Sequence, residues 1–120
     1  MACTKQTVAI DKAIEQYFDA VVSGQEVEHG KPAPDIFLLA AERIGVPIED
    51  CYVFEDAFNG VNAGVSSGAR TIMVPDLVQP TDEIREKVAA VCTTLKQASE
   101  KIENDEIWDH CEVIFLIQKI

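Results

Sequence analysis

A lysine and a pair of acidic residues are the groups in this sequence that could do chemistry. Lys31 lies in the stretch EHGKPAPDIF, behind a glycine and ahead of Pro-Ala-Pro-Asp. Proline fixes the backbone angle φ, so this composition holds the lysine in few conformations. Glu55 and Asp56 end the apolar run CYVFED. A fixed ammonium group near two carboxylates could bind a cation and an anion together.

Such a trio suits the binding of Mg²⁺ together with phosphate. Mg²⁺ commonly takes one or two protein carboxylates and completes its octahedron with water and phosphate oxygens. We therefore expect Glu55 and Asp56 to hold Mg²⁺ and Lys31 to contact the phosphate. A structural role is the alternative: Asp56 would cap the following helix, while Glu55 and Lys31 would be solvated surface charges. The spacing alone leaves both interpretations open.

Alternating strands and helices are predicted to position these groups. We expect strands at 18–24, 51–56, 71–76, 89–92 and 111–118, and helices at 8–17, 34–45, 59–68, 81–88 and 94–102. This rhythm is typical of an α/β domain with a parallel sheet. Ligands of such sheets bind beyond the carboxyl ends of the strands. Glu55, Asp56 and the loop carrying Lys31 are expected at that edge.

Composition narrows the function classes. The 120 residues suit one domain, and the net charge of −11 disfavours nucleic acid as a partner. No apolar run is long enough to cross a bilayer, and the first residues do not resemble a signal peptide. The four cysteines and two histidines lack zinc-ligand spacing. We expect reduced thiols and a cytoplasmic location.

Two long stretches resemble a known family. GKPAPDIFLLAAERIGV, followed by CYVFEDAFNGVNAGVSSGA, is similar to the haloacid dehalogenase (HAD) superfamily and, within it, to the β-phosphoglucomutase-like phosphatases. The resemblance covers about residues 13–103. It implies a HAD-like Rossmannoid three-layer α/β/α core with a parallel sheet. It also implies a Mg²⁺-dependent phosphatase or phosphomutase whose substrate is a small phosphomonoester, such as a sugar phosphate.

The resemblance also assigns roles to single residues. Lys31 matches the lysine that stabilises the nucleophilic aspartate and the transferring phosphoryl group, and Glu55 and Asp56 match the acidic pair that positions Mg²⁺. Gly60 matches the glycine in the turn behind that pair. Thr4 is the candidate for the Ser or Thr that hydrogen-bonds the phosphate.

The family's attacking group is missing. Its Asp-x-Asp-x-Thr/Val motif does not occur in the sequence. We therefore expect residues 1–103 to form the C-terminal part of a HAD-like core, without the central nucleophile strand or the cap domain. Mg²⁺ binding is then expected to be weak or absent.

Residues 104–120 are expected to form an extra tail with a strand at 111–118. That strand would pair with the strand at 51–56, in the position left by the nucleophile strand, or with an outer edge. The alternative is a frayed or self-associating tail.

Two functions stay open at this point. The chain is a HAD-type phosphatase or phosphomutase that lacks its nucleophile half and is inactive alone, or it is a noncatalytic fragment that docks with a partner chain. That partner would be a complementing N-terminal half or a second copy. A receiver-like signalling domain fits less well, because Asp56 is already assigned within the HAD-like motifs. The sequence leaves open whether the chain is an enzyme.

Overall fold

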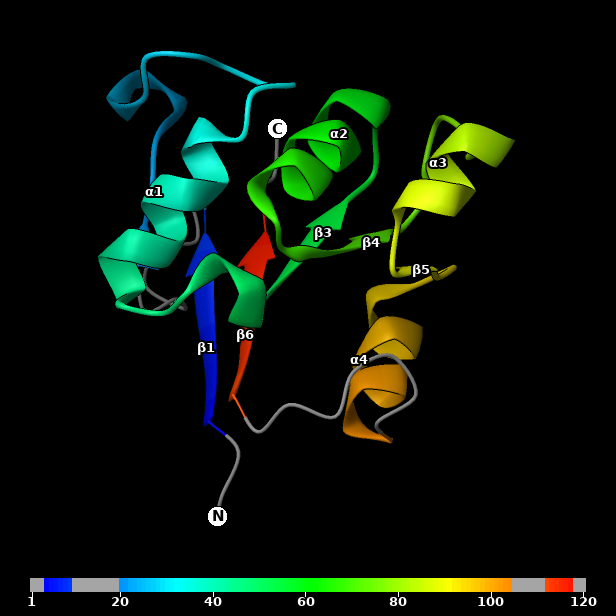
Figure 1. Ribbon diagram of the computed structural model, residues 1–120. Helices are drawn as coiled ribbons and strands as arrows, with labels where there is room; N and C mark the ends of the chain where they lie inside the picture. The colour runs from blue at the N-terminus through cyan, green and yellow to red at the C-terminus, as the bar shows by residue number, and fades with distance from the viewer. Residues whose placement is uncertain (1–3, 10–19, 105–111, 118–120) are drawn as a thin grey trace.

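The chain folds around one parallel sheet. A computed structural model describes residues 4–9, 20–104 and 112–117 (Figure 1). The strands are β1 (Thr4–Ala9), β2 (Ala20–Val21), β3 (Cys51–Glu55), β4 (Arg70–Met73), β5 (Ala90–Val91) and β6 (Glu112–Ile117). Their order in the sheet is β2-β1-β6-β3-β4-β5, and every described pairing is parallel. The predicted α/β class with a parallel sheet is confirmed.

The helices lie close to their predicted positions. They are α1 (Asp35–Ile44), α2 (Phe58–Ser67), α3 (Asp82–Lys87) and α4 (Leu95–Glu103), with short 3₁₀ turns η2 (Gly24–Glu26) and η3 (Ile48–Asp50). Gly45 and Gly68 end α1 and α2 with φ of 73° and 94°, a left-handed conformation that glycine adopts without strain. The Thr81 hydroxyl begins α3 by accepting a hydrogen bond from the Ile84 amide.

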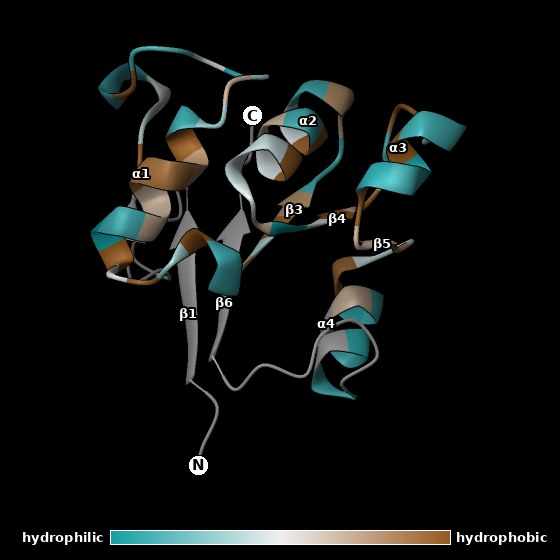
Figure 2. Ribbon diagram, viewed as in Figure 1, coloured by the Kyte–Doolittle hydropathy of each residue, from teal (hydrophilic) through white to brown (hydrophobic). Residues whose placement is uncertain are grey.

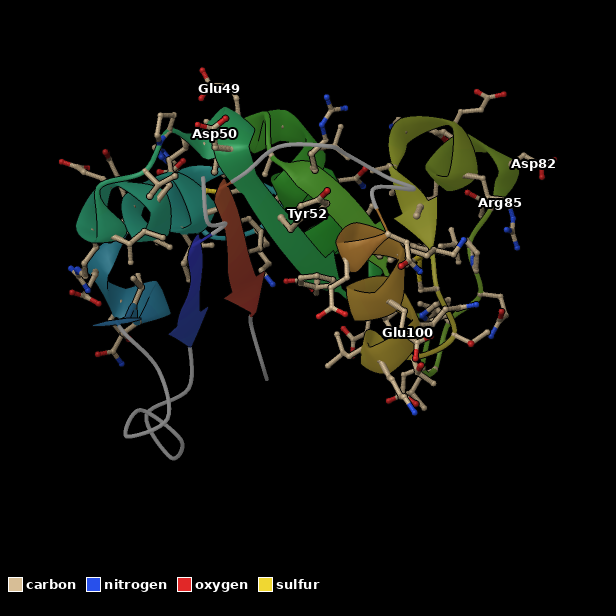
Figure 3. All side chains as sticks on the ribbon, turned by 90° about the horizontal axis from the view of Figure 1, so that it is seen from below. Glu49, Asp50, Tyr52, Asp82, Arg85 and Glu100 are labelled. Atoms are coloured by element: carbon tan, nitrogen blue, oxygen red, sulfur yellow. The ribbon has the colours of Figure 1, made fainter. Side chains whose placement is uncertain are left out.

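Helices cover both faces of the sheet. All five residues of β3 are buried, as expected for a strand between two layers. Cys51 and Val53 pack in one apolar cluster with residues of α1 and α2, whereas Tyr52 packs in another with Ala98 of α4 (Figure 3). The short α3 is mostly hydrophilic and buries Ile84 (Figure 2). This is the three-layer arrangement expected from the sequence.

The tail strand β6 lies inside the sheet, between β1 and β3 (Figure 1). It runs parallel to both neighbours, with Ile114 opposite Cys51 and Ile117 opposite Phe54. A strand was predicted at 111–118, and the position beside β3 was one of two expected for it. β6 thus takes the place beside β3 in which the resemblance would put the missing nucleophile strand.

The start of the chain differs from its prediction. A helix was expected over 8–17, but residues 8 and 9 belong to β1; residues 10–17 lie outside the described part. Val8 pairs with Ala20 on one side and Leu116 on the other. Pairing on both edges outweighs the helical spacing of apolar residues that favoured a helix. The strand predicted at 18–24 is described over Ala20–Val21 alone.

None of the helices in the described ranges is long and apolar enough to span a bilayer.

Candidate functional site

Lys31 and Glu55 meet at the carboxyl end of β3. The Lys31 ammonium donates a hydrogen bond to Oε1 of Glu55 and forms an ion pair with it. Both groups are shielded from solvent, with exposed side-chain fractions of 15% and 2% respectively. The Lys31 nitrogen also lies 5.3 Å from the centre of the Phe37 ring, within range of a cation–π interaction. The expectation that Lys31 reaches the edge carrying Glu55 is confirmed.

The loop carrying Lys31 is fastened at several points. The Gly30 carbonyl accepts a hydrogen bond from the Ala33 amide at 3.0 Å, which closes a turn around the cis Lys31–Pro32 peptide. Just before this turn, the His29 amide donates a hydrogen bond of 3.3 Å to Oδ2 of Asp35, which lies in the first turn of α1. These contacts fix the lysine in place before any ligand arrives, which is what an anion-binding group requires.

An ion pair ties the segment before this loop to α1. Nη2 of Arg43 lies 2.8 Å from Oε1 of Glu26, and the second oxygen of Glu26 accepts a hydrogen bond from the Ser23 amide at 2.7 Å. The sequence did not predict this ion pair. Residues 26 and 43 lie far apart in the sequence, so no local pattern pairs them.

Glu55 is held in a tight space. Burial raises the pKa of its carboxyl, and the hydrogen bond and charge of Lys31 oppose that rise. The first turns of α2 pass so close that a Cβ built on Gly60 would lie 2.7 Å from Oε1 of Glu55, and closer still to Cδ and Oε2. Gly60 therefore allows the helix backbone and the carboxylate to approach each other.

Replacing Gly60 with alanine should push the Glu55 carboxylate away from Lys31. We expect a loss of about 1–3 kcal/mol in the free energy of unfolding, typical of an extra methyl group in a filled interior. Urea denaturation would measure it. Gly24→Ala is the matched control, since a Cβ there meets nothing within 4 Å. Equal stability of the two variants would show that Glu55 moves aside without cost.

Asp56 follows Glu55 and is exposed at the same edge. The N-cap of α2 is Ala57, which makes no side-chain capping bond, so Asp56 does not have the capping role that was the alternative to metal binding. Asp56 can offer a carboxylate to a cation, and Glu55 can offer a second while it also holds Lys31. Across the described ranges there is no group of three or more His, Cys, Asp or Glu side chains that could hold a metal ion. A Mg²⁺ ion here would take its other ligands from water or phosphate.

Thr4 is not brought to this edge. It begins β1 opposite Glu112, whereas Ala9 at the other end of β1 is level with Ile117 and hence with Phe54. Five residue steps separate the two levels, roughly 16 Å at the rise of a strand. Thr4 thus lies at the amino end of the sheet, where Glu49 and Asp50 precede β3 (Figure 3).

Phe37 also lies at the site, and nothing in the sequence predicted that position. The helical spacing of α1 placed it among core residues, and it is indeed fully buried. Its contact with the Lys31 ammonium depends on how the loop folds back over α1, and no spacing pattern encodes that contact.

Comparisons with known proteins agree on one family. The family model of haloacid dehalogenase-like hydrolases matches residues 3–68. A probable pseudouridine-5'-phosphatase of Drosophila melanogaster is 61% identical over 56 residues, which are 45% of this chain and 24% of that protein. Fructose-1-phosphate phosphatase YqaB of Escherichia coli is 49% identical over 61 residues, 51% of this chain and 32% of that protein.

Solved structures agree as well. The crystal structure of a putative β-phosphoglucomutase from Thermotoga maritima superposes with a TM-score of 0.58 at 36% identity, over 67% of this chain and 38% of that one. The chain spans about a quarter to a third of the length of the two curated relatives. What these proteins do as wholes therefore bears on this chain only as a source of hypotheses.

Proposed function

Because this chain belongs to the haloacid dehalogenase-like hydrolases, we propose that Lys31, Glu55 and Asp56 form the phosphate- and Mg²⁺-binding part of a phosphatase or phosphomutase. The proposed substrate is a small phosphomonoester, such as a sugar phosphate. The observation that carries the proposal is the shielded Lys31–Glu55 ion pair at the carboxyl end of β3, beside the exposed Asp56. The match with the family over residues 3–68 includes all three residues.

The three side chains divide the work in this proposal. Lys31 places a fixed positive charge where phosphate oxygens would lie, and Glu55 keeps that charge oriented. Asp56, with Glu55, would hold Mg²⁺. When bound, Mg²⁺ supplies positive charge that offsets the negative charge of a phosphoryl group. Such preorganised charges are a large part of catalysis in phosphoryl transfer.

Among the residues that the structure describes, Lys31, Glu55 and Asp56 have no attacking group beside them. The Asp-x-Asp motif does not occur in the sequence, and the strand beside β3 is EVIFLI, which ends in Ile117. Cys51 does not replace it, because burial raises the pKa of its thiol to about 12 and it lies at the amino end of β3. We propose that the chain is inactive by itself.

Purified protein should therefore not hydrolyse p-nitrophenyl phosphate at enzymatic rates in the presence of Mg²⁺. Typical enzymes turn over at about 1 s⁻¹ or faster. Lys31→Ala serves as the control, because a contaminating phosphatase would be indifferent to it. Turnover at that rate that disappears in the Lys31→Ala variant would overturn the proposed inactivity.

Mg²⁺ binding should be weak and should depend on Asp56 and Glu55. Two carboxylates make an incomplete shell, so we expect the amide resonances of residues 55–57 to shift during an NMR titration with millimolar Mg²⁺. Asp56→Asn should abolish the shifts, and Glu49→Gln, an exposed acid at the other end of β3, should leave them unchanged. Shifts that cluster at the acidic segment 103–109 instead would contradict the assignment.

A noncatalytic role is the second candidate. The missing nucleophile favours a module that keeps the anion site and docks with a partner chain, either a complementing N-terminal half or a second copy. Light scattering of the purified protein separates a monomer from a self-associated form. We also propose a cytoplasmic location, which the free thiols of Cys51 and Cys92 support.

A further inference from the structure

The strand position beside the site is held by the tail of the same chain. β3 carries Glu55 and has two neighbours, β4 on one side and β6 on the other. On the β4 side, Val74 directly follows β4 and donates its amide to the Glu55 carbonyl at 2.8 Å. That edge of β3 therefore has no room for another strand. A strand from another polypeptide could therefore bring a reactive group alongside β3 only by taking the place of β6.

β6 is paired along both of its edges. Ile114 lies opposite Gln6 and Cys51, and Leu116 lies opposite Val8 and Val53. Without β6, the facing edges of β1 and β3 would expose unpaired backbone groups inside the sheet, at a cost in free energy for each. Some strand must therefore fill this position.

The covalent link of β6 to the rest of the chain favours its pairing over that of a strand from another polypeptide. It follows α4, which ends at Glu103, after a segment of eight residues, 104–111. A short tether gives an attached segment an effective concentration in the millimolar range, about a thousand times a free partner at micromolar concentration. A free strand of similar affinity would thus seldom displace it.

We propose that β6 is an internal plug, which closes the sheet between β1 and β3 and keeps strands of other polypeptides from pairing there. That the excluded strand would bring a nucleophile to Lys31, Glu55 and Asp56 rests on the proposed function; the plug itself does not. At the level of Phe54 the plug presents Ile117, a residue without acid-base or nucleophilic chemistry. The chain thus fills the position between β1 and β3 with a strand of its own.

The test uses the full chain with a protease site inserted between residues 107 and 108. The probe is a fluorescent peptide of residues 109–120 with Cys111→Ser, followed by fluorescence anisotropy and gel filtration. Uncut protein should not take up the peptide. After cleavage, the chain's own fragment, residues 108–120, should stay bound, and the loss of the tether should let the peptide exchange with it. Hydrogen exchange of uncut wild-type protein should show protected amides in 112–117, comparable to those in 51–55.

Each outcome bears on the plug without any activity measurement. Uptake of the peptide by uncut protein would overturn the proposal, because the position would then be open. Unprotected amides in 112–117 would overturn it as well. So would loss of the fragment after cleavage from a remainder whose circular dichroism is unchanged. Loss of the fragment together with unfolding of the remainder would support it. Phosphate or Mg²⁺ binding could fail in the experiments above without changing these results.

Discussion

Replacing Lys31 with alanine is expected to lower the free energy of unfolding by about 3–5 kcal/mol at neutral pH, because the change leaves a buried carboxylate without its cation. Glu55 keeps 2% of its side chain exposed, so water cannot take the place of the ammonium group without local opening. The loss should be much smaller in the double variant Lys31→Ala/Glu55→Gln, which removes the buried charge together with its partner.

The size of this loss should depend on pH. Burial raises the pKa of Glu55 in the folded protein, and Lys31 provides the main opposing effects. In the Lys31→Ala variant that pKa should rise further. A group whose folded pKa exceeds its unfolded pKa contributes stability below the unfolded pKa, and this contribution is lost as the pH rises through the folded value. The gap between wild type and variant should therefore be smallest near pH 4 and should widen toward pH 7.

Urea denaturation followed by circular dichroism between pH 4 and pH 8 would measure the gap. Lys87→Ala is the matched control: Lys87 pairs with Glu83 at 2.8 Å, but that pair lies at the surface, where ion pairs contribute little. The control should show no comparable loss at any pH. A Lys31→Ala loss that is the same at pH 4 and pH 7 would mean that the buried charge of Glu55 is not its cause.

Local features of the sequence were enough to predict most of the helices. α1 and α2 were found within a residue or two of their bounds, because glycines mark their ends and apolar residues recur with helical spacing. The grouping of Lys31 with Glu55 was also predictable, since the carboxyl ends of parallel strands meet at one edge. What this reasoning could not give is the direct ion pair between them, which depends on the path of the loop.

The errors lie where distant segments pair. The helical pattern of apolar residues over 8–17 gave no sign that residues 8 and 9 would join β1, because that strand is defined by partners over a hundred residues away in β6. The resemblance suggested Thr4 as a phosphate contact, but Thr4 begins β1 and so lies at the opposite edge of the sheet. Side-chain spacing identifies an element, but its direction and neighbours come from the whole fold.

Replacing Ile114 with proline should lower the melting temperature by about 4–12 °C. Ile114 lies near the middle of β6 and faces Gln6 and Cys51 across the two adjoining strands. Proline has no amide to donate, so a hydrogen bond of an interior strand is lost and its acceptor stays buried and unpaired, at about 1–3 kcal/mol. A chain of 120 residues lies between the sizes for which each kcal/mol shifts the melting temperature by about 4–8 °C and by about 2–4 °C, so we use about 4 °C.

Asp82→Pro is the control for the substitution itself. Asp82 is the first residue of α3, a position that proline favours, and Thr81 before it already has the extended backbone that proline requires. Thermal denaturation of the two variants beside wild type separates loss of the β6 ladder from a general effect of proline.

Deleting residues 109–120 should have a larger effect than Ile114→Pro, because it unpairs the facing edges of both β1 and β3. If the deletion variant melts at the wild-type temperature and stays as soluble, β6 does not complete the sheet, and the strand position beside the Lys31–Glu55 site is open to another chain.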